Sequence, residues 1–195
     1  MKKFFLILLL FSSISYGQFF EPGQAKGLFL DIAIGPRFPI GKFSNTSILG
    51  VGGDITISYT DNKKLPFFIY GRIGYQHYPG NQDFYKTTNY ASFSSNAVIL
   101  NAGARYYFAP IIKDLVLLMP VMEGGVSFGY FEKSHIFKAG SGRENFTEDV
   151  GKMGAHIGAG FSMFLLDVIV YYNFFQNNQY ISADIKVRIP IYAII

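Results

Sequence analysis

The histidines are the residues of this chain best suited to hold a metal ion. His77, His135 and His156 lie far apart in separate segments, and the chain has no cysteine. Structural zinc sites usually take two of their ligands from a short interval of sequence. The spacing therefore predicts no metal site, and nothing else in the sequence indicates a cofactor.

One polar segment holds the residue types of a serine hydrolase. The residues are Ser134, His135, Ser141, Glu144 and Asp149. A lipid-modifying barrel enzyme would need a nucleophile, a histidine base and an orienting acid at the level of the outer leaflet. Polar loops commonly contain these same residue types, and no lipase motif surrounds them. We therefore expect a solvated loop, no catalytic residues and no enzymatic activity.

The most informative polar residues are charges that fall on one face of a series of extended segments. Five acids and five bases form this set, and one histidine shares their face. The residues are Asp31, Arg37, Asp54, Arg72, Arg105, Glu123, His156, Asp167, Asp184, Lys186 and Arg188. Equal numbers of both signs suit a narrow enclosed space in which the charges pair. We expect a structural charge network, and a selective channel is the alternative.

The elements that would position these charges are strands, because apolar residues alternate with small or polar ones. In the last segment, isoleucine and valine alternate with Asp184, Lys186 and Arg188. Seven similar segments precede it, at 28–35, 49–59, 67–76, 98–108, 122–130, 154–163 and 167–174. Such alternation predicts strands with one apolar face. Segments of about 9–11 residues also have the length of a tilted strand that crosses a bilayer.

The distribution of charge indicates which face of these strands is wet. The apolar face carries no charge in any of the eight segments. A charge facing lipid costs about 2–4 kcal/mol at the bilayer midplane, so this absence is expected of a lipid-facing wall. A soluble, lipocalin-like barrel would need the reverse arrangement, with an apolar interior.

The connections between the segments alternate between short and long. Thr60–Leu65 and Ala109–Asp114 are short, whereas Pro79–Ser95 and Glu132–Lys152 are long and polar. Membrane barrels have short periplasmic turns and longer outer loops. The chain is therefore predicted to be all-β, an eight-stranded antiparallel up-and-down transmembrane β-barrel with a polar, side-chain-filled lumen. Both termini would lie in the periplasm.

Glycines on one strand face indicate close packing inside this barrel. Gly154, Gly158 and Gly160 share the parity of the lumen residues in their segment. Their spacing matches neither a helical dimer motif in an apolar helix nor a dinucleotide-binding loop. We expect bulky lumen side chains to lie against them.

The first residues have the layout of a secretory signal peptide. Lysines at positions 2 and 3 precede the apolar stretch Phe4–Phe11, and Ser15 and Gly17 suit a cut before Gln18. Eight apolar residues are too few for a spanning helix, which needs about 20. We expect residues 1–17 to be cleaved and residues 18–195 to form one barrel domain.

Overall composition excludes several classes of protein. Half of the residues are hydrophobic, yet no long apolar run follows the signal peptide, which excludes a helical membrane protein. The formal charge of +4 falls to about +2 when the two signal lysines are removed, and no basic run would grip phosphates. We expect no nucleic-acid partner, and no disulfide can hold the fold.

The order of four short motifs resembles the outer-membrane β-barrel family common in Bacteroidota, related in architecture to small OmpA-like, OmpX-like and PorT-like barrels. The motifs are GPRFPIGKFS at Gly35–Ser44, NAGARYYF at Asn101–Phe108, PVMEGGVSFGY at Pro120–Tyr130 and GAHIGAGF at Gly154–Phe161. The resemblance implies a place in the cell envelope and insertion by the outer-membrane assembly machinery.

A barrel of this kind is expected to act through its outer loops. We expect a monomer surrounded by outer-membrane lipid, whose loops contact extracellular or envelope proteins in a structural or surface-interaction role. The alternatives are a small, porin-like selective channel, a secretion-accessory barrel and, less favoured, a lipid-modifying enzyme.

Overall fold

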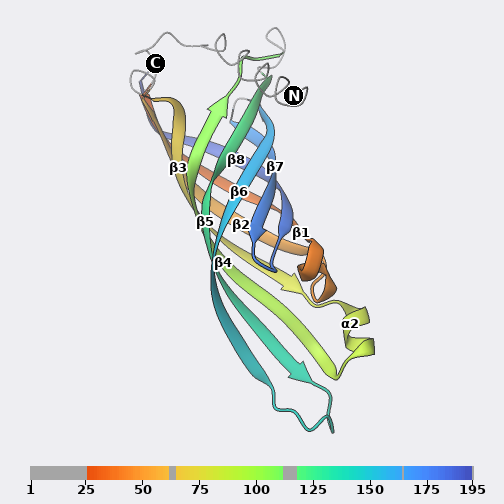
Figure 1. Cartoon of the computed structure of the whole chain (residues 1–195). Coiled ribbons are helices and arrows are strands. Elements are labelled where there is room, and N and C mark those ends of the chain that lie inside the picture. The colour runs from red at the N-terminus through yellow and green to blue at the C-terminus, as the bar shows by residue number, and fades with distance from the viewer. Residues whose placement is uncertain (1–25, 62–64, 112–117, 164, 195) are drawn as a thin grey trace, which may run out of the picture.

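Eight antiparallel strands close into a ring in the computed structural model of this protein (Figure 1). The structure describes residues 26–61, 65–111, 118–163 and 165–194. The strands are β1 (Lys26–Pro39), β2 (Gly50–Asp61), β3 (Leu65–Pro79), β4 (Tyr90–Tyr107), β5 (Leu118–Phe137), β6 (Phe146–Met163), β7 (Leu166–Phe175) and β8 (Tyr180–Ile194). The short helices η2 (Gly41–Asn45) and α2 (Gln82–Thr87) follow β1 and β3.

Each strand pairs with the next in sequence, and β1 pairs with β8 to close the ring. This topology confirms the predicted eight-stranded antiparallel up-and-down barrel, and each of the eight alternating segments is a strand. No helix among the described residues is long and apolar enough to cross a membrane. The predicted signal peptide, residues 1–17, lies outside the described residues.

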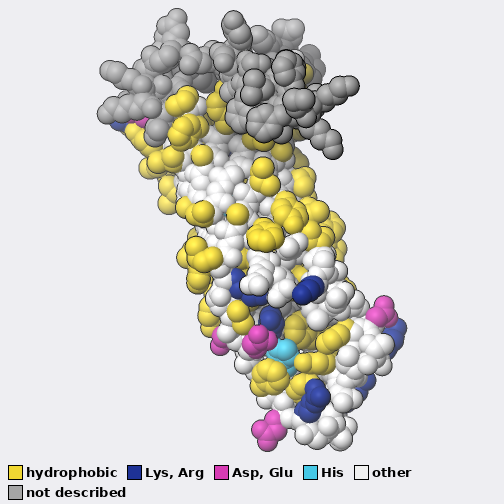
Figure 2. Space-filling model, in the orientation of Figure 1, with side chains coloured by type: hydrophobic (Ala, Val, Ile, Leu, Met, Phe, Trp, Pro, Cys, Tyr) yellow, Lys and Arg dark blue, Asp and Glu magenta, His cyan; other side chains and the backbone are white. Residues whose placement is uncertain are grey.

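The outer wall of the barrel is apolar and exposed. Ile34, Val126 and Ile185 point outward and are 70%, 60% and 54% exposed. Hydrophobic side chains cover much of the visible wall in Figure 2, while charged side chains gather toward the end that carries α2. A soluble protein rarely exposes an apolar surface of this extent, whereas the wall of a transmembrane barrel requires one.

Strict alternation along each strand produces this inverted arrangement. In β7, exposed and buried residues alternate at every position from Leu166 to Phe175. Successive side chains of a strand point to opposite faces, so one face of β7 lines the lumen and the other lines the wall. The sequence therefore fixes the face of each side chain once the strand is formed.

An aromatic layer closes the lumen at the end that carries η2. Phe43 of η2 packs edge-on against Tyr78 with their ring centroids 4.7 Å apart, and Tyr180 lies against Tyr78 at 5.8 Å. Phe131 and Phe175 complete this buried cluster. The lumen is filled by side chains, as predicted for an eight-stranded barrel.

Glycine in β6 lets a lumen side chain approach the wall, as predicted. A Cβ atom on Gly158 would lie 2.3 Å from the ring of Tyr171, and one on Gly154 would lie 2.7 Å from the ring of Phe175. Glycine is therefore required where these aromatic rings lie against the β6 backbone.

The strands of one part of the sheet are longer than predicted. The long loops expected at Pro79–Ser95 and Glu132–Lys152 are largely ordered structure, because β4 begins at Tyr90, β5 extends to Phe137 and β6 begins at Phe146. These segments are polar because the ends of the strands lie beyond the apolar wall and do not face lipid. Their polar sequence therefore resembled that of loops. The prediction of two long loops was wrong in this respect.

The two ends of the ring differ. Lys26 pairs with Ile194, so β1 begins and β8 ends at the same end of the barrel. The opposite end carries η2, α2 and the extended parts of β4, β5 and β6 (Figure 1). At that end the tight turn between β7 and β8 places Asn177 in the left-handed region with φ 63°, and Asn178 N–H donates to the Phe175 carbonyl.

Candidate functional site

The inward face of the barrel holds all eleven charged and histidine residues predicted for the lumen. None of them is more than 8% exposed, and Asp31, Arg105, Asp167 and Lys186 are completely buried. Burial of a charge is costly unless a partner compensates it, so the contacts among these groups decide what the site can do.

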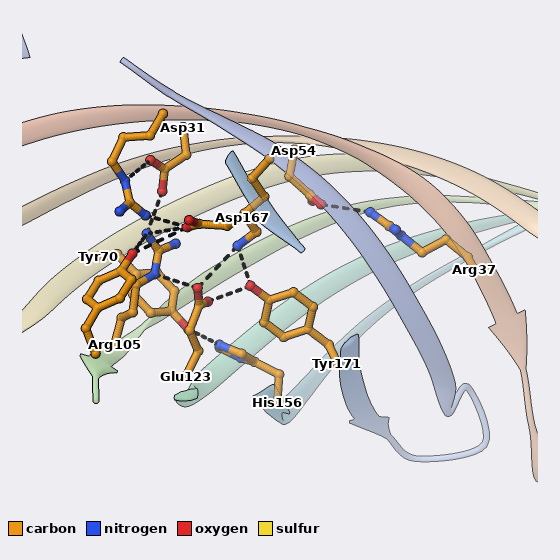
Figure 3. A network of polar contacts seen from close by, with 12 residues as sticks. Asp31, Arg37, Asp54, Tyr70, Arg105, Glu123, His156, Asp167 and Tyr171 are labelled. Carbon is orange, nitrogen blue, oxygen red and sulfur yellow. Dashed lines mark hydrogen bonds and ion pairs between the residues drawn. The ribbon is translucent and has the colours of Figure 1, made fainter. Parts of the chain in front are cut away.

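Arg105 of β4 lies at the centre of the larger cluster (Figure 3). Its Nε donates to Glu123 Oε1 at 2.5 Å, and its Nη1 donates to Asp31 Oδ2 at 2.7 Å. Arg188 donates from Nε to Asp31 Oδ1 at 2.9 Å and from Nη2 to Asp167 Oδ2 at 2.6 Å. These contacts join β1, β4, β5, β7 and β8 across the lumen.

Glu123 extends the cluster toward the aromatic layer. Its Oε2 accepts a hydrogen bond from the Tyr171 hydroxyl at 2.7 Å, and Lys186 Nζ lies 3.4 Å from its Oε1. Lys186 also donates to the Tyr171 hydroxyl. Lys186 is thus paired with Glu123, whereas Arg188, two residues further along β8, is paired with Asp31.

Arg37 forms a smaller cluster with its two neighbouring strands. Its Nη2 donates to Asp54 Oδ2 at 2.7 Å, and its Nη1 donates to Asp184 Oδ1. Asp54 lies on β2 and Asp184 on β8, so Arg37 links the strands on both sides of β1 near the ring closure.

Arg72 is held differently from the other lumen cations. Its guanidinium lies over the ring of Tyr171, with Cζ 4.5 Å from the ring centroid. With the Asn101 amide oriented to satisfy its neighbours, Arg72 Nε donates to the amide oxygen at 3.0 Å. An aromatic face and an amide oxygen thus hold the Arg72 guanidinium.

His156 joins two neutral groups inside the lumen. Its Nε2 lies 2.5 Å from the Tyr70 hydroxyl, and its Nδ1 lies 2.9 Å from the Ser127 hydroxyl. Both contacts are buried beneath the wall, where a substrate has no visible access. The arrangement suits a polar core contact better than a catalytic pair.

The lumen network is therefore a set of mutually compensating charges. Its five acids and five bases balance, and most of them make direct ion pairs (Figure 3). Removing one partner of a buried pair leaves an uncompensated charge, which is strongly destabilising. The geometry supports a structural role that fixes how strands lie across the lumen.

A second group of polar residues lies where three strands extend past the ring. Pairing of β3 with β4 ends at Ser94, and pairing of β7 with β6 ends at Gly154. Beyond these points only β4, β5 and β6 continue, and they pair with one another. We call these extensions, Tyr90–Phe93, Glu132–Phe137 and Phe146–Met153, the protruding sheet.

His135 is the central polar residue on the inner face of the protruding sheet. Its Nδ1 lies 3.0 Å from the Tyr90 hydroxyl, and its ring stacks on Phe146 with centroids 4.3 Å apart. Its Nε2 lies 3.3 Å from Glu148 Oε2, close enough for an ion pair but not aligned as a hydrogen bond.

Glu148 is also bound by Lys133, whose Nζ lies 3.2 Å from its Oε1. Partial burial raises the pKa of the Glu148 carboxyl, but the hydrogen bond and positive charge of Lys133, with a contribution from His135, outweigh it. The pKa therefore lies below its ordinary value, and Glu148 is ionised at neutral pH.

The structure does not assemble the serine hydrolase set that the sequence raised as an alternative. Ser134 and Asp149 lie on the outer face of the protruding sheet, whereas His135 lies on the inner face, because neighbouring residues of a strand alternate. Ser141 and Glu144 lie in the 138–145 turn. The carboxylate nearest His135 is Glu148, which had not been considered.

The three histidines have separate partners. His77 contacts Asn96, His135 contacts Tyr90, and His156 contacts Tyr70. Within residues 26–61, 65–111, 118–163 and 165–194, no group of three or more metal-binding side chains comes together.

Tyrosines and small polar residues are the part of the lumen that sequence reasoning missed. Tyr70, Tyr171 and Asn101 share the parity of the lumen charges, so the alternation placed them on the correct face. Their roles as hydrogen-bond and ring partners depend on contacts across the barrel, which parity does not reveal.

Comparisons with known proteins reveal similarity at the level of structure. No protein-family model matches the chain, and no curated protein matches its sequence. The crystal structure of Neisserial surface protein A is similar, with a TM-score of 0.51 and 15% identity over 85% of this chain and 97% of that one.

Two further solved structures share this likeness. Ail, the attachment invasion locus protein of Yersinia pestis, is 13% identical, with a TM-score of 0.49 over 85% of this chain and 99% of that one. The N-terminal β-barrel domain of Pseudomonas aeruginosa OprF is 13% identical, with a TM-score of 0.48 over 85% and 98%. At such identities the likeness is one of fold, and the chain has the fold of small eight-stranded outer-membrane β-barrel proteins.

Proposed function

We propose that this protein is an outer-membrane β-barrel that uses its protruding sheet to contact proteins outside the cell. The observation that carries the proposal is the protruding sheet itself, in which three of eight strands continue past the ring as paired structure. A barrel that served only to span the bilayer would need no such extension. An ordered sheet held away from the wall offers a rigid surface for binding.

The arrangement of polar and apolar surface supports a place in a membrane. The exposed wall is apolar, and the charges of the spanning strands lie inside the barrel in compensating pairs. Outer-membrane lipid would surround this wall, and the outer-membrane assembly machinery would insert it. We propose a monomer with no nucleic-acid partner.

The difference between the two ends of the barrel supports an orientation. Both the start of β1 and the end of β8 lie at the end opposite the protruding sheet. In bacterial barrels the short-turn end that carries the termini faces the periplasm. The protruding sheet would then face the outside.

The other candidate functions have less support. A selective channel conflicts with the buried aromatic layer and the paired charges that fill the lumen. A lipid-modifying enzyme conflicts with the separation of Ser134 from His135. A secretion-accessory barrel would have the same architecture, and deletion of its gene would have to impair protein export.

Trypsin treatment of intact cells tests the proposal. Lys138 and Arg143 are exposed in the turn at the tip of the protruding sheet, so trypsin should cut there without opening the cells. A variant with glutamine at both positions is the control, because it should resist cleavage at the tip. Protection of the wild-type tip until the envelope is opened would contradict the orientation and the proposed function.

Gel mobility tests the membrane barrel separately. A closed barrel resists detergent unfolding at room temperature, so unboiled and boiled samples should migrate differently. Extraction of the protein into buffer without detergent would contradict a place in the membrane.

A further inference from the structure

The two edge strands of the protruding sheet, β4 and β6, differ in whether another element covers their backbone. On the β4 edge, the Tyr85 hydroxyl of α2 accepts from Phe93 N–H at 3.0 Å and donates to the Phe93 carbonyl at 2.8 Å. Lys138 Nζ holds α2 in place by donating to the carbonyls of Tyr85 and Thr88, each at 2.8 Å. One helix therefore caps this edge with hydrogen bonds.

The β6 edge has no comparable cap in the part of the chain that the structure describes. Phe146–Met153 pair with β5 on one side, and β7 joins the other side only from Gly154 onward. Among the described residues, no side chain or neighbouring strand bonds to the backbone on this open side. Eight residues of strand span about 27 Å, and about half of their backbone groups point away from β5.

Open strand edges are normally blunted, because they can pair with another chain. Here the same sheet caps one edge with a dedicated helix and leaves the other available. We propose that the open β6 edge binds an extended segment of another protein by strand addition. The inference rests on the proposed function, which places the protruding sheet outside the cell.

The outer face of the sheet indicates the charge of that segment. Four polar residues form a row of directly opposite partners across β3, β4, β5 and β6: His77, Asn96, Glu132 and Asp149. Asn96 Oδ1 accepts a hydrogen bond from His77 Nδ1 at 2.7 Å, and Asn96 Nδ2 donates to Glu132 Oε1 at 3.2 Å. The row ends at the open edge in two adjacent carboxylates, although Asp149 also contacts the Tyr130 hydroxyl.

A lysine or arginine on the incoming strand, opposite Asp149, would continue this row and compensate both acids. Like charges directly opposite one another are destabilising, whereas opposite charges stabilise a strand pair. On the inner face an apolar side chain of the incoming strand would fit, because Phe146 is 51% exposed and Val150 is partly exposed there. The fitting partner is an extended segment with basic residues on one face and apolar residues on the other.

A second copy of this chain fits the edge less well. Two copies in one membrane run their β6 strands in the same direction, so the strands would pair in parallel. A two-fold axis that brings the two open edges together turns their outer faces to opposite sides of the joint sheet. Asp149 of one copy would then lie beside Glu148 or Val150 of the other, and neither is a basic partner for it. The charge pattern therefore favours a foreign segment over self-association.

Peptide binding to the full-length protein in lipid nanodiscs tests the inference. The probe is a capped nine-residue peptide that alternates valine with threonine and carries one central lysine, and its counterpart carries glutamate instead. The lysine peptide should bind about fivefold more tightly, which corresponds to about 1 kcal/mol for one exposed charge pair. Asp149→Lys should reverse this preference. Asp83→Lys, the same change at an exposed residue of α2, should leave it unaltered.

Backbone pairing is tested with two N-methylated forms of the lysine peptide. One form blocks every second amide, and the other form blocks the remaining amides. Strand addition requires that one form lose binding and the other retain it. Equal binding by both forms, or an Asp149→Lys variant with unchanged preference, would overturn the inference.

Two further outcomes separate this inference from the proposed function. Suppose that trypsin cuts the tip on intact cells, but that peptide binding does not change in Asp149→Lys or on N-methylation of the peptide. This result would overturn strand addition and leave the proposed function standing. An Asp149-dependent dimer of the protein alone, seen by sedimentation, would overturn the foreign partner in favour of a second copy.

Discussion

At the scale of single residues, buried charges determine how this barrel is held together. Arg105 contacts Glu123 and Asp31, and Arg188 contacts the same Asp31. Each carboxylate thus receives bonds from more than one cation or hydroxyl. Such shared contacts fix the strands relative to one another more closely than the outer apolar residues can, since lipid contacts are non-directional.

Arg105→Met should destabilise the folded barrel by about 3 kcal/mol, because it leaves buried carboxylates with fewer partners. The measurement is urea unfolding in lipid vesicles, in which the shifted gel band of the folded form reports the folded fraction. Arg143→Met is the control, since Arg143 is exposed in the 138–145 turn, and it should change stability by less than about 0.5 kcal/mol.

A double variant distinguishes unpaired charge from lost packing. Arg105→Met combined with Glu123→Met removes both charges of the pair, and it should recover part of the stability lost in the single variant. If the double variant lost more stability than the two single variants lose in total, the explanation by unpaired charge would be contradicted.

The identity of the lumen residues was predictable from the sequence, but their partners were not. Strand parity assigned Asp31 and Arg188 to the same side of the sheet, although they are 157 residues apart. Which cation meets which acid depends on strand tilt and register around a closed ring. A single sequence carries no direct signal for either.

At the scale of elements, β6 combines two roles in one strand. Its second half lies in the barrel wall, where Gly158 makes room for Tyr171, and its first half forms the open edge of the protruding sheet. The prediction placed a loop over that first half, because polar residues such as Glu148 and Lys152 interrupt the apolar alternation. Strand pairing with β5 overrides this local signal, since the two strands continue in register to Phe146.

Gly158→Val should destabilise the barrel by about 1–3 kcal/mol, because the new side chain would push Tyr171 away from Glu123. Gly124→Ala is the matched control in the neighbouring strand. A Cβ there meets its nearest atom at 3.6 Å, so stability should stay close to wild type. Urea midpoints in vesicles measure both, and equal midpoints for the two variants would contradict the packing described for β6.

At the scale of the whole molecule, the barrel has a lumen filled by side chains and is not an open channel. Buried aromatic residues close it near η2, and paired charges occupy the lumen below. The overall architecture was the most predictable feature, because eight alternating segments without outward charges admit few other folds. The protruding sheet was not predicted, since its strands lie outside the apolar pattern from which the architecture was inferred.

The filled lumen predicts that the protein does not conduct ions. Purified protein inserted into a planar bilayer should leave the current at its baseline, because buried aromatic side chains and paired charges fill the lumen. The gel mobility of the same preparation confirms that the barrel is folded. Repeated stepwise openings by the folded protein would contradict a closed lumen and revive the channel alternative.

Closure of the ring by β1 and β8 has a consequence for how the chain reaches its final form. β8 supplies Arg188 and Asp184, which compensate Asp31 and Arg37 on β1. Until β8 arrives, β1 has a bare edge and the first strand's charges lack these counterparts. Contacts this distant in sequence form slowly. Closure of the ring between β1 and β8 thus neutralises these interior charges and completes the wall in the same step.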